Sequence, residues 1–159
     1  MQPLATNIPV AVIGAGAMGS GIAQVAAQAG HQVFLLDQRE GAAEAGRQSV
    51  AKQLQRRVDK GKMEQAALDA LLERIKPISE LSELAEAGLV IEAIVEDLEI
   101  KRGLLASLED VCGDSTILAT NTSSISVTAL GAKMKLPERL VGMHFFNPAP
   151  LMALVEVIK

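Results

Sequence analysis

The stretch that most constrains the fold is "VAVIGAGAMGSGIAQVAAQAGHQVFLLDQ". The apolar run at 8–13 ends in glycine, which is typical of a strand covered on both faces of its sheet. The proline-free segment 17–29 has apolar residues at helical spacing, so we predict a helix that Gly30 ends. The run at 32–36 predicts a second strand, which closes on Asp37. Such a unit places its two strands parallel, joined by a right-handed crossover.

The turn between the first strand and the helix matches the pattern G-x-G-x-x-G. In such a turn, Gly14 allows the sharp bend, Gly16 leaves room for a pyrophosphate, and Gly19 lets the helix approach the strand. The start of the helix offers unpaired N–H groups and partial positive charge to that phosphate. Small residues that serve packing alone are the alternative. The candidate cofactor contacts in this turn are Gly14, Ala15, Gly16, Ala17, Met18 and Gly19.

Asp37 lies at the end of the second predicted strand. A carboxylate there accepts hydrogen bonds from both ribose hydroxyls of an adenosine and repels a 2′-phosphate, so NAD is favoured over NADP. Arg39 leaves the alternative open, because a nearby arginine can accommodate a 2′-phosphate. We include the neighbouring Gln38 among the candidate cofactor contacts.

The rest of the chain alternates between helical and strand patterns. Segment 40–72 is helical in character with a break at Gly61, and its stretch 47–62 is rich in Lys and Arg, either as a solvated helix face or as a binding surface. Further strands are predicted at 75–78, 116–120, 139–146 and 154–159, and from 88 to near 96; further helices are predicted at 80–87, 97–112 and 126–133. This order predicts an α/β fold of the Rossmann type, a doubly wound, mostly parallel sheet with a long helical insertion after the second strand. We expect one domain, residues 1–159.

Composition narrows the possible partners. Apolar residues make up 49% of the chain and no apolar run is long enough to span a bilayer, so we expect a cytoplasmic protein without a membrane partner. The net charge of −4 and the absence of Trp and Tyr argue against nucleic acid. The single cysteine, Cys112, excludes an internal disulfide and is expected in the core. We expect no metal site.

Two segments near the C-terminus carry polar groups suited to chemistry. Asn121–Ser124 follows a predicted strand, at the sheet edge where ligands of open α/β folds bind, although these residues also suit a helix cap. His144 ends one predicted strand and Glu156 lies on the next. If those strands pair, Glu156 can orient the imidazole of His144 as a general base. That arrangement favours a dehydrogenase, with a structural histidine as the alternative.

These residues resemble the L-3-hydroxyacyl-CoA dehydrogenase family, the NAD enzymes of fatty-acid β-oxidation and related CoA-thioester pathways. The resemblance covers residues 10–159 and rests on the glycine-turn stretch, on "VIEAIVEDLEIKRGLL", and on "NTSSIS" with "GMHFFNPAPLMALVEVI". Within the family, "LQRRVDKGK" and "NTSSISVTAL" look most like bacterial members that act on 3-hydroxybutyryl-CoA, or on 3-hydroxyadipyl-CoA in phenylacetate breakdown.

The resemblance implies roles for individual residues. His144 looks like the catalytic base that helps oxidise an (S)-3-hydroxyacyl-CoA to a 3-oxoacyl-CoA, with Glu156 as its orienting carboxylate. Ser123 matches the serine that lies between the substrate's 3-oxygen and the nicotinamide. The other matched positions are Glu96, Lys101 and Asn147, which would contact the cofactor. The helical segment 40–72 corresponds to the family's insertion that reaches toward coenzyme A, and within it we pick Lys60 as the coenzyme A contact.

The resemblance implies that family members continue beyond the last matched strand into a helical domain, which we expect this chain to lack. That domain carries most of the dimer interface and part of the acyl pocket, so a homodimer is implied for the full-length enzyme. We expect this chain to bind NAD and to turn over poorly alone. Two alternatives stay open: a related hydroxy-acid or sugar-acid dehydrogenase, such as an L-gulonate dehydrogenase, and a non-catalytic NAD-sensing module.

Overall fold

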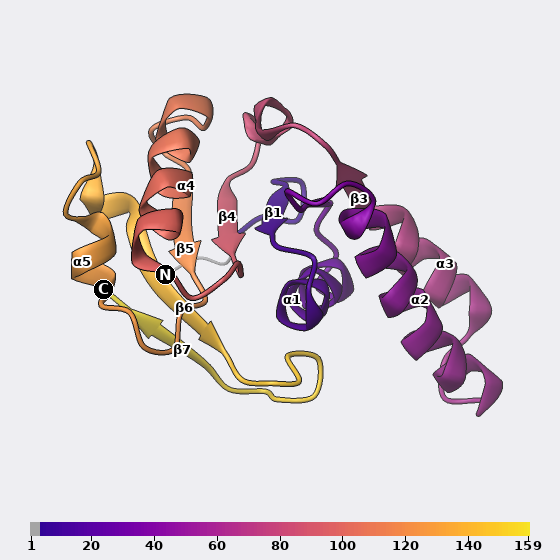
Figure 1. Ribbon diagram of the computed structural model, residues 1–159. Coiled ribbons are helices and arrows are strands. Elements are labelled where there is room, and N and C mark those ends of the chain that lie inside the picture. Colours follow the sequence, from indigo (N-terminus) through magenta and orange to yellow (C-terminus); the bar gives the residue numbers. More distant parts are fainter. Residues whose placement is uncertain (1–3) are drawn as a thin grey trace.

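The computed structural model describes residues 4–159 and contains one seven-stranded sheet in the order β3-β2-β1-β4-β5-β6-β7 (Figure 1). Neighbouring strands from β3 to β6 are parallel, whereas β7 runs antiparallel to β6. The strands are β1 (Val10–Ile13), β2 (Val33–Leu36), β3 (Ile75–Ile78), β4 (Leu89–Glu92), β5 (Ile117–Thr120), β6 (Leu140–Phe145) and β7 (Val155–Ile158). The predicted doubly wound, mostly parallel sheet is therefore confirmed.

Helices cover both faces of this sheet. The α-helices are α1 (Ala17–Gln28), α2 (Ala42–Asp59), α3 (Gln65–Arg74), α4 (Leu98–Val111) and α5 (Val127–Gly131), and the short 3-10 helices are η1 (Leu81–Leu84) and η2 (Pro137–Arg139). Figure 1 shows α2 and α3 side by side as an arm beyond β3. They are the predicted helical insertion, and Gly61, at φ +65°, lies in the turn between them.

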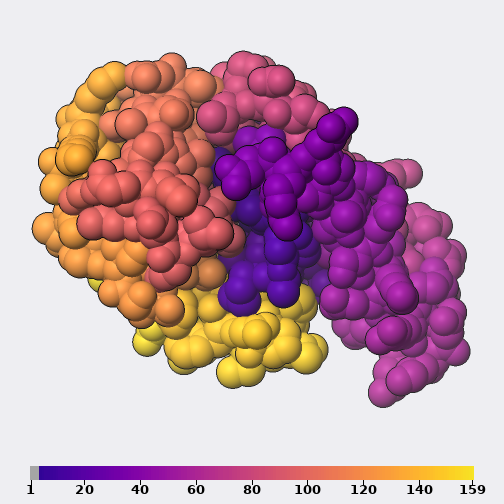
Figure 2. Space-filling model, in the orientation of Figure 1, coloured from indigo at the N-terminus to yellow at the C-terminus, as the bar shows by residue number. Residues whose placement is uncertain are grey.

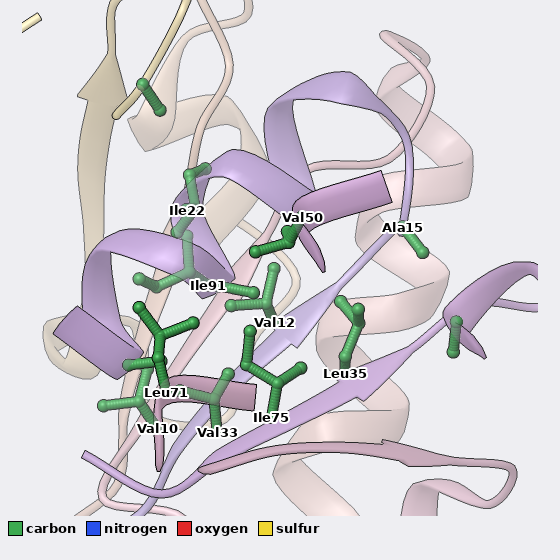
Figure 3. Close-up of a cluster of buried hydrophobic side chains, with 14 of the residues drawn as sticks. Val10, Val12, Ala15, Ile22, Val33, Leu35, Val50, Leu71, Ile75 and Ile91 are labelled. Carbon is green, nitrogen blue, oxygen red and sulfur yellow. The ribbon is translucent and has the colours of Figure 1, made fainter. Parts of the chain in front are cut away.

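The core consists of two apolar layers, one on each face of the sheet. Along β1, Val10 and Val12 point into the layer beneath α1, α2 and α3, whereas Ala11 and Ile13 point toward α4. The first layer is drawn in Figure 3 and also contains Ile22, Val33, Leu35, Val50, Leu71, Ile75 and Ile91. Cys112 is buried in the second layer, as expected. Central strands covered on both faces need apolar residues at every position, which explains the unbroken run in β1.

Two predicted elements differ from the structure. The helix predicted at 80–87 is only the short η1, because Gly88 already pairs with Pro9 at the start of β4. The strand predicted from 88 to near 96 ends at Glu92, because the chain leaves the sheet and Asp97 then caps α4. Glu96 therefore lies on a loop at the carboxyl edge of the sheet. In the part of the chain that is described, no helix is long and apolar enough to cross a membrane.

Candidate active site

The glycine turn is a tight loop at the start of α1 with open space beside Gly16. Gly14 has φ +99°, and a Cβ there would lie 2.5 Å from the Ala93 carbonyl oxygen. A Cβ on Gly19 would lie 1.7 Å from the Gly14 carbonyl oxygen, so helix and strand approach as closely as the sequence predicts. Gly16 differs, because a Cβ there would meet no atom within 4 Å. No side chain in residues 4–159 caps this helix start. Its first-turn N–H groups are therefore available to an anion.

Asp37 is fixed at the end of β2 beside the turn. Its Oδ2 accepts a hydrogen bond from the Ala15 N–H at 2.8 Å, and its Oδ1 accepts one from the Arg39 Nε at 3.1 Å. Burial would raise the pKa of this carboxyl, but the hydrogen bonds from Arg39 and from the Ala15 N–H outweigh it and lower the pKa to about 2. Asp37 is therefore ionised at neutral pH, as an acceptor for ribose hydroxyls must be.

A cleft of about 780 Å³ begins at this turn. Gly14, Gly16, Asp37 and Gln38 line one side of it. Ile94, Val95, Ile100 and Leu104 line the other. Figure 2 shows the indigo N-terminal segment at the bottom of a hollow between the surfaces of α4 and α2. An apolar wall, an ionised carboxylate and free N–H groups together fit the adenosine and pyrophosphate of a dinucleotide.

His144 and Glu156 face each other across β6 and β7. They are directly paired in the antiparallel register, and His144 Nδ1 lies 3.0 Å from Glu156 Oε2. The imidazole also packs against the ring of Phe146, with a centroid separation of 4.7 Å. This confirms the strand pairing that the spacing of the two residues suggested. Because the carboxylate occupies Nδ1, Nε2 is the ring nitrogen left for a substrate.

The loop after β5 lies next to His144. Asn121 Oδ1 accepts a hydrogen bond from the Phe145 N–H at 2.8 Å, which ties the start of the loop to the residue after His144. Ser123 is exposed on this loop. Since β5 and β6 are parallel neighbours, their carboxyl ends meet, and Ser123 and His144 lie at one edge of the sheet. Asn147 is exposed in the turn that follows β6.

Glu96 organises the loop that carries Ser123. Its Oε1 accepts hydrogen bonds from the Thr122 hydroxyl, the Ser123 N–H at 3.2 Å and the Ser124 hydroxyl at 3.1 Å. Burial acts to raise the pKa of Glu96, but the hydrogen bond from Thr122 and the charge of Lys101 lower it below its usual value. The structure therefore brings Glu96 and Ser123 together.

Lys101 lies behind this loop rather than on its surface. Its side chain is 1% exposed, and its Nζ lies 2.8 Å from both carboxylate oxygens of Glu92 and 3.3 Å from Glu96 Oε2. Glu92 was not among the residues picked out from the sequence. The available signal was an acidic residue inside the otherwise apolar strand "LVIEAI".

Lys60 lies elsewhere, at the end of α2 in the helical arm, where it is exposed. Arg56 and Arg57 in the last turn of α2 are exposed as well. The arm therefore presents a basic surface at its outer end.

In residues 4–159 no group of three or more His, Cys, Asp and Glu side chains is arranged to bind a metal ion.

Comparison with known proteins agrees with this geometry. A family model described as "3-hydroxyacyl-CoA dehydrogenase, NAD binding domain" matches residues 9–159. A 3-hydroxyadipyl-CoA dehydrogenase of Escherichia coli is 50% identical over 150 residues, which cover 94% of this chain and 32% of that protein. A 3-hydroxybutyryl-CoA dehydrogenase of Clostridioides difficile is 44% identical, and the match covers 94% of this chain and 53% of the relative.

Solved structures give the same result. A crystal structure of 3-hydroxybutyryl-CoA dehydrogenase from Escherichia coli superposes with a TM-score of 0.93 at 49% identity, covering 97% of this chain and 32% of that chain. The chain thus spans about half or less of the length of these relatives. The matched range, residues 9–159, spans the glycine turn, Asp37, the Ser123 loop and the His144–Glu156 pair. The chain therefore belongs to the 3-hydroxyacyl-CoA dehydrogenase family, and the part that it matches is the NAD-binding domain of that family.

Proposed function

We propose that this chain binds NAD and supplies the general base of a dehydrogenase that oxidises an (S)-3-hydroxyacyl-CoA to a 3-oxoacyl-CoA. The observation that carries the proposal is the pairing of His144 Nδ1 with Glu156 Oε2 at 3.0 Å, at the same sheet edge as Ser123. An NAD-binding module without chemistry needs no oriented base. The pair therefore favours an enzyme over a sensor.

In the proposed reaction, Nε2 of His144 takes the proton from the 3-hydroxyl of the substrate. Glu156 keeps the ring in the required orientation and stabilises the imidazolium that forms. The Ser123 hydroxyl donates a hydrogen bond to the same oxygen, which favours the developing carbonyl. NAD, when bound, supplies the hydride acceptor. The reverse reaction uses the same groups, with His144 as the acid.

The proposed cofactor contacts fall into two groups. The glycine turn and Asp37 would bind the pyrophosphate and the adenosine ribose, and Gln38 lines the same cleft. Glu96, Ser123 and Asn147 lie at the carboxyl edges of β4, β5 and β6, where the nicotinamide half would bind. Lys101 would act from behind Glu96, because its side chain is only 1% exposed.

We further propose that the substrate is a CoA thioester rather than a free acid. The relatives compared above are named for 3-hydroxyadipyl-CoA and 3-hydroxybutyryl-CoA. The exposed basic end of α2, which includes Lys60, would face the phosphates of coenzyme A. A homodimer of the longer enzymes, which the family resemblance implies, belongs to the same proposal. So does the cytoplasmic location, which we expect from the composition of the chain.

A single-turnover assay tests this function. We expect the chain, in excess over NADH, to reduce acetoacetyl-CoA slowly, because the side chain of Glu156 is 52% exposed and water reaches the reacting groups. His144→Gln should lower that rate by roughly 100-fold or more, the usual contribution of a general base, without changing NADH affinity. NADH binding is followed by the fluorescence of the reduced nicotinamide.

Each alternative predicts a different result. Reduction of free acetoacetate as fast as its CoA thioester would favour a hydroxy-acid or sugar-acid dehydrogenase. NADH binding with no reduction of either compound would favour a sensing module. An unchanged rate in His144→Gln would show that the base is assigned wrongly.

A further inference from the structure

A buried ion pair lies beneath the loop that carries Ser123. Glu92, the last residue of β4, and Lys101, in the first turns of α4, have side chains that are 0% and 1% exposed. Both carboxylate oxygens of Glu92 lie 2.8 Å from Lys101 Nζ. The Thr120 hydroxyl donates to Oε1, and the Ile94 N–H donates to Oε2 at 3.2 Å. The carboxylate is thus fully surrounded by donors.

Fold stability alone is a weak reason for such a pair. Removing two charges from water carries a large free-energy cost, and replacing a buried pair by apolar residues of similar size is often neutral or stabilising. The pair also lies at the carboxyl ends of β4 and β5, the edge at which ligands of this fold class bind. Its place in the fold therefore points to the site rather than to the core.

One chain of contacts leads from this pair to the surface loop. Lys101 Nζ lies 3.3 Å from Glu96 Oε2, and Oε1 of the same carboxylate accepts hydrogen bonds from Thr122 and from the Ser123 N–H. The side chain of Glu96 is 40% exposed, so it has freedom to move unless a partner fixes it. Lys101 is the buried, charged partner of this carboxylate, and Glu92 fixes Lys101.

A second chain of contacts runs through the backbone. The hydroxyl of Thr120, which donates to Glu92, accepts the Thr122 N–H at 3.2 Å. The backbone carbonyl of Glu92 accepts the Asn121 N–H at 2.9 Å, and Asn121 Oδ1 in turn accepts the Phe145 N–H beside His144. Glu92 is therefore connected both to the Ser123 loop and to the strand that carries the proposed base.

We propose that Glu92 is a positioning residue for the nicotinamide half of the cleft. It fixes Lys101, and through Lys101 it presets Glu96 and the Ser123 segment in the conformation that receives the cofactor. This inference rests on the proposed NAD-dependent function. It adds a buried residue, outside the set of direct contacts, on which affinity at that half depends.

The division of the cleft provides the test. Asp37 and the glycine turn belong to the β1–β2 half of the cleft. ADP lacks the nicotinamide riboside, so its affinity should not depend on Glu92. Glu92→Gln keeps the side-chain size and removes the charge that fixes Lys101. We expect NADH to bind roughly 3- to 30-fold more weakly to this variant, while ADP binds within about twofold of the wild-type chain. Both affinities are measured by titration calorimetry.

A double variant separates positioning from stability. Glu92→Gln/Lys101→Met removes both buried charges, so it should regain thermal stability relative to Glu92→Gln and still bind NADH weakly. If the single variant does not fold, NADH affinity is measured on the double variant instead. Wild-type NADH affinity in both variants would overturn the proposal, as would equal weakening of NADH and ADP. A wild-type chain that binds no NADH would overturn the proposed function instead.

Discussion

Gly16 and Gly19 lie in one turn, but the structure gives them different tasks. A Cβ on Gly16 meets nothing within 4 Å, and its backbone, at φ −69° and ψ −171°, suits any residue. Gly16→Ala should therefore lower the unfolding free energy by less than about 1 kcal/mol. It should nevertheless weaken NADH binding about tenfold or more, because the methyl group occupies the pyrophosphate seat. Urea denaturation and NADH titration measure the two effects.

Gly19→Ala is the matched comparison at the same turn. Its Cβ would lie 1.7 Å from the Gly14 carbonyl oxygen, a backbone atom that cannot move aside without shifting β1 against α1. We expect a loss of stability of roughly 1–3 kcal/mol. Wild-type NADH affinity in Gly16→Ala would contradict the proposal that the pyrophosphate binds against Gly16. Wild-type stability in Gly19→Ala would contradict the close approach of α1 to β1 at Gly19.

The pKa of Asp37 predicts how binding depends on pH. Because the pKa lies at about 2, the carboxylate stays ionised as the pH falls from neutral, and its contribution to ADP affinity is lost only near that value. Arg39 supplies much of the lowering, so Arg39→Ala should move the pKa back toward the ordinary 3.8. ADP affinity in Arg39→Ala should then fall at a higher pH than in wild type. Titrations between about pH 3 and pH 7 check this, and coincident profiles would contradict it.

At the level of elements, α4 depends on the cap at its start. Asp97 Oδ1 accepts hydrogen bonds from the N–H groups of Glu99 at 3.0 Å and Ile100 at 2.9 Å. Asp97→Ala should lower the unfolding free energy by about 1 kcal/mol, whereas Asp97→Asn, which keeps an acceptor, should stay within a few tenths. Thermal unfolding of the wild-type chain, Asp97→Ala and Asp97→Asn measures these differences in stability. Equal loss in both variants would mean that the charge, not the cap, stabilises α4.

Elements with a strong local signal were predictable from the sequence. The strand–turn–helix around Gly14, the break at Gly61 and the pairing of His144 with Glu156 all depend on short-range patterns. The end of β4 was not predictable in this way. "VIEAIVE" remains apolar enough to suggest a longer strand, and its end depends on Asp97, which caps the following helix.

The role of Glu92 could not be read from the sequence for a related reason. Its partners Thr120 and Lys101 come from β5 and α4, and only the packed sheet brings them together. Lys101 illustrates the same limit. A lysine on a helix that starts at the sheet edge predicts a contact with a ligand, but nothing in the sequence indicated that its side chain is buried and pairs with the carboxylates of Glu92 and Glu96.

At the scale of the whole molecule, the proposed site residues fall into two groups, one on each half of the sheet. The β1–β3 half carries the glycine turn and Asp37, whereas the β4–β7 half carries Glu96, Ser123 and His144. At equal concentrations, a dinucleotide that contacts both halves should stabilise the fold more than a ligand that contacts one, because the added stability grows with the logarithm of the ratio of ligand concentration to dissociation constant. With a dinucleotide bound, both halves of the chain should therefore be stabilised together against unfolding.

Thermal unfolding with different nucleotides tests this coupling. NADH at about 100 times its dissociation constant should stabilise the chain by about 2.7 kcal/mol, which raises the melting temperature by roughly 5–11 °C for a domain of this size. NADPH at the same concentration should give a smaller shift, because its 2′-phosphate would meet the ionised Asp37 carboxylate. Asp37→Ala should reduce the shift with NADH and narrow the difference between the two nucleotides. Equal shifts with NADH and NADPH in the wild-type chain would instead mean that Arg39 turns from Asp37 to the 2′-phosphate.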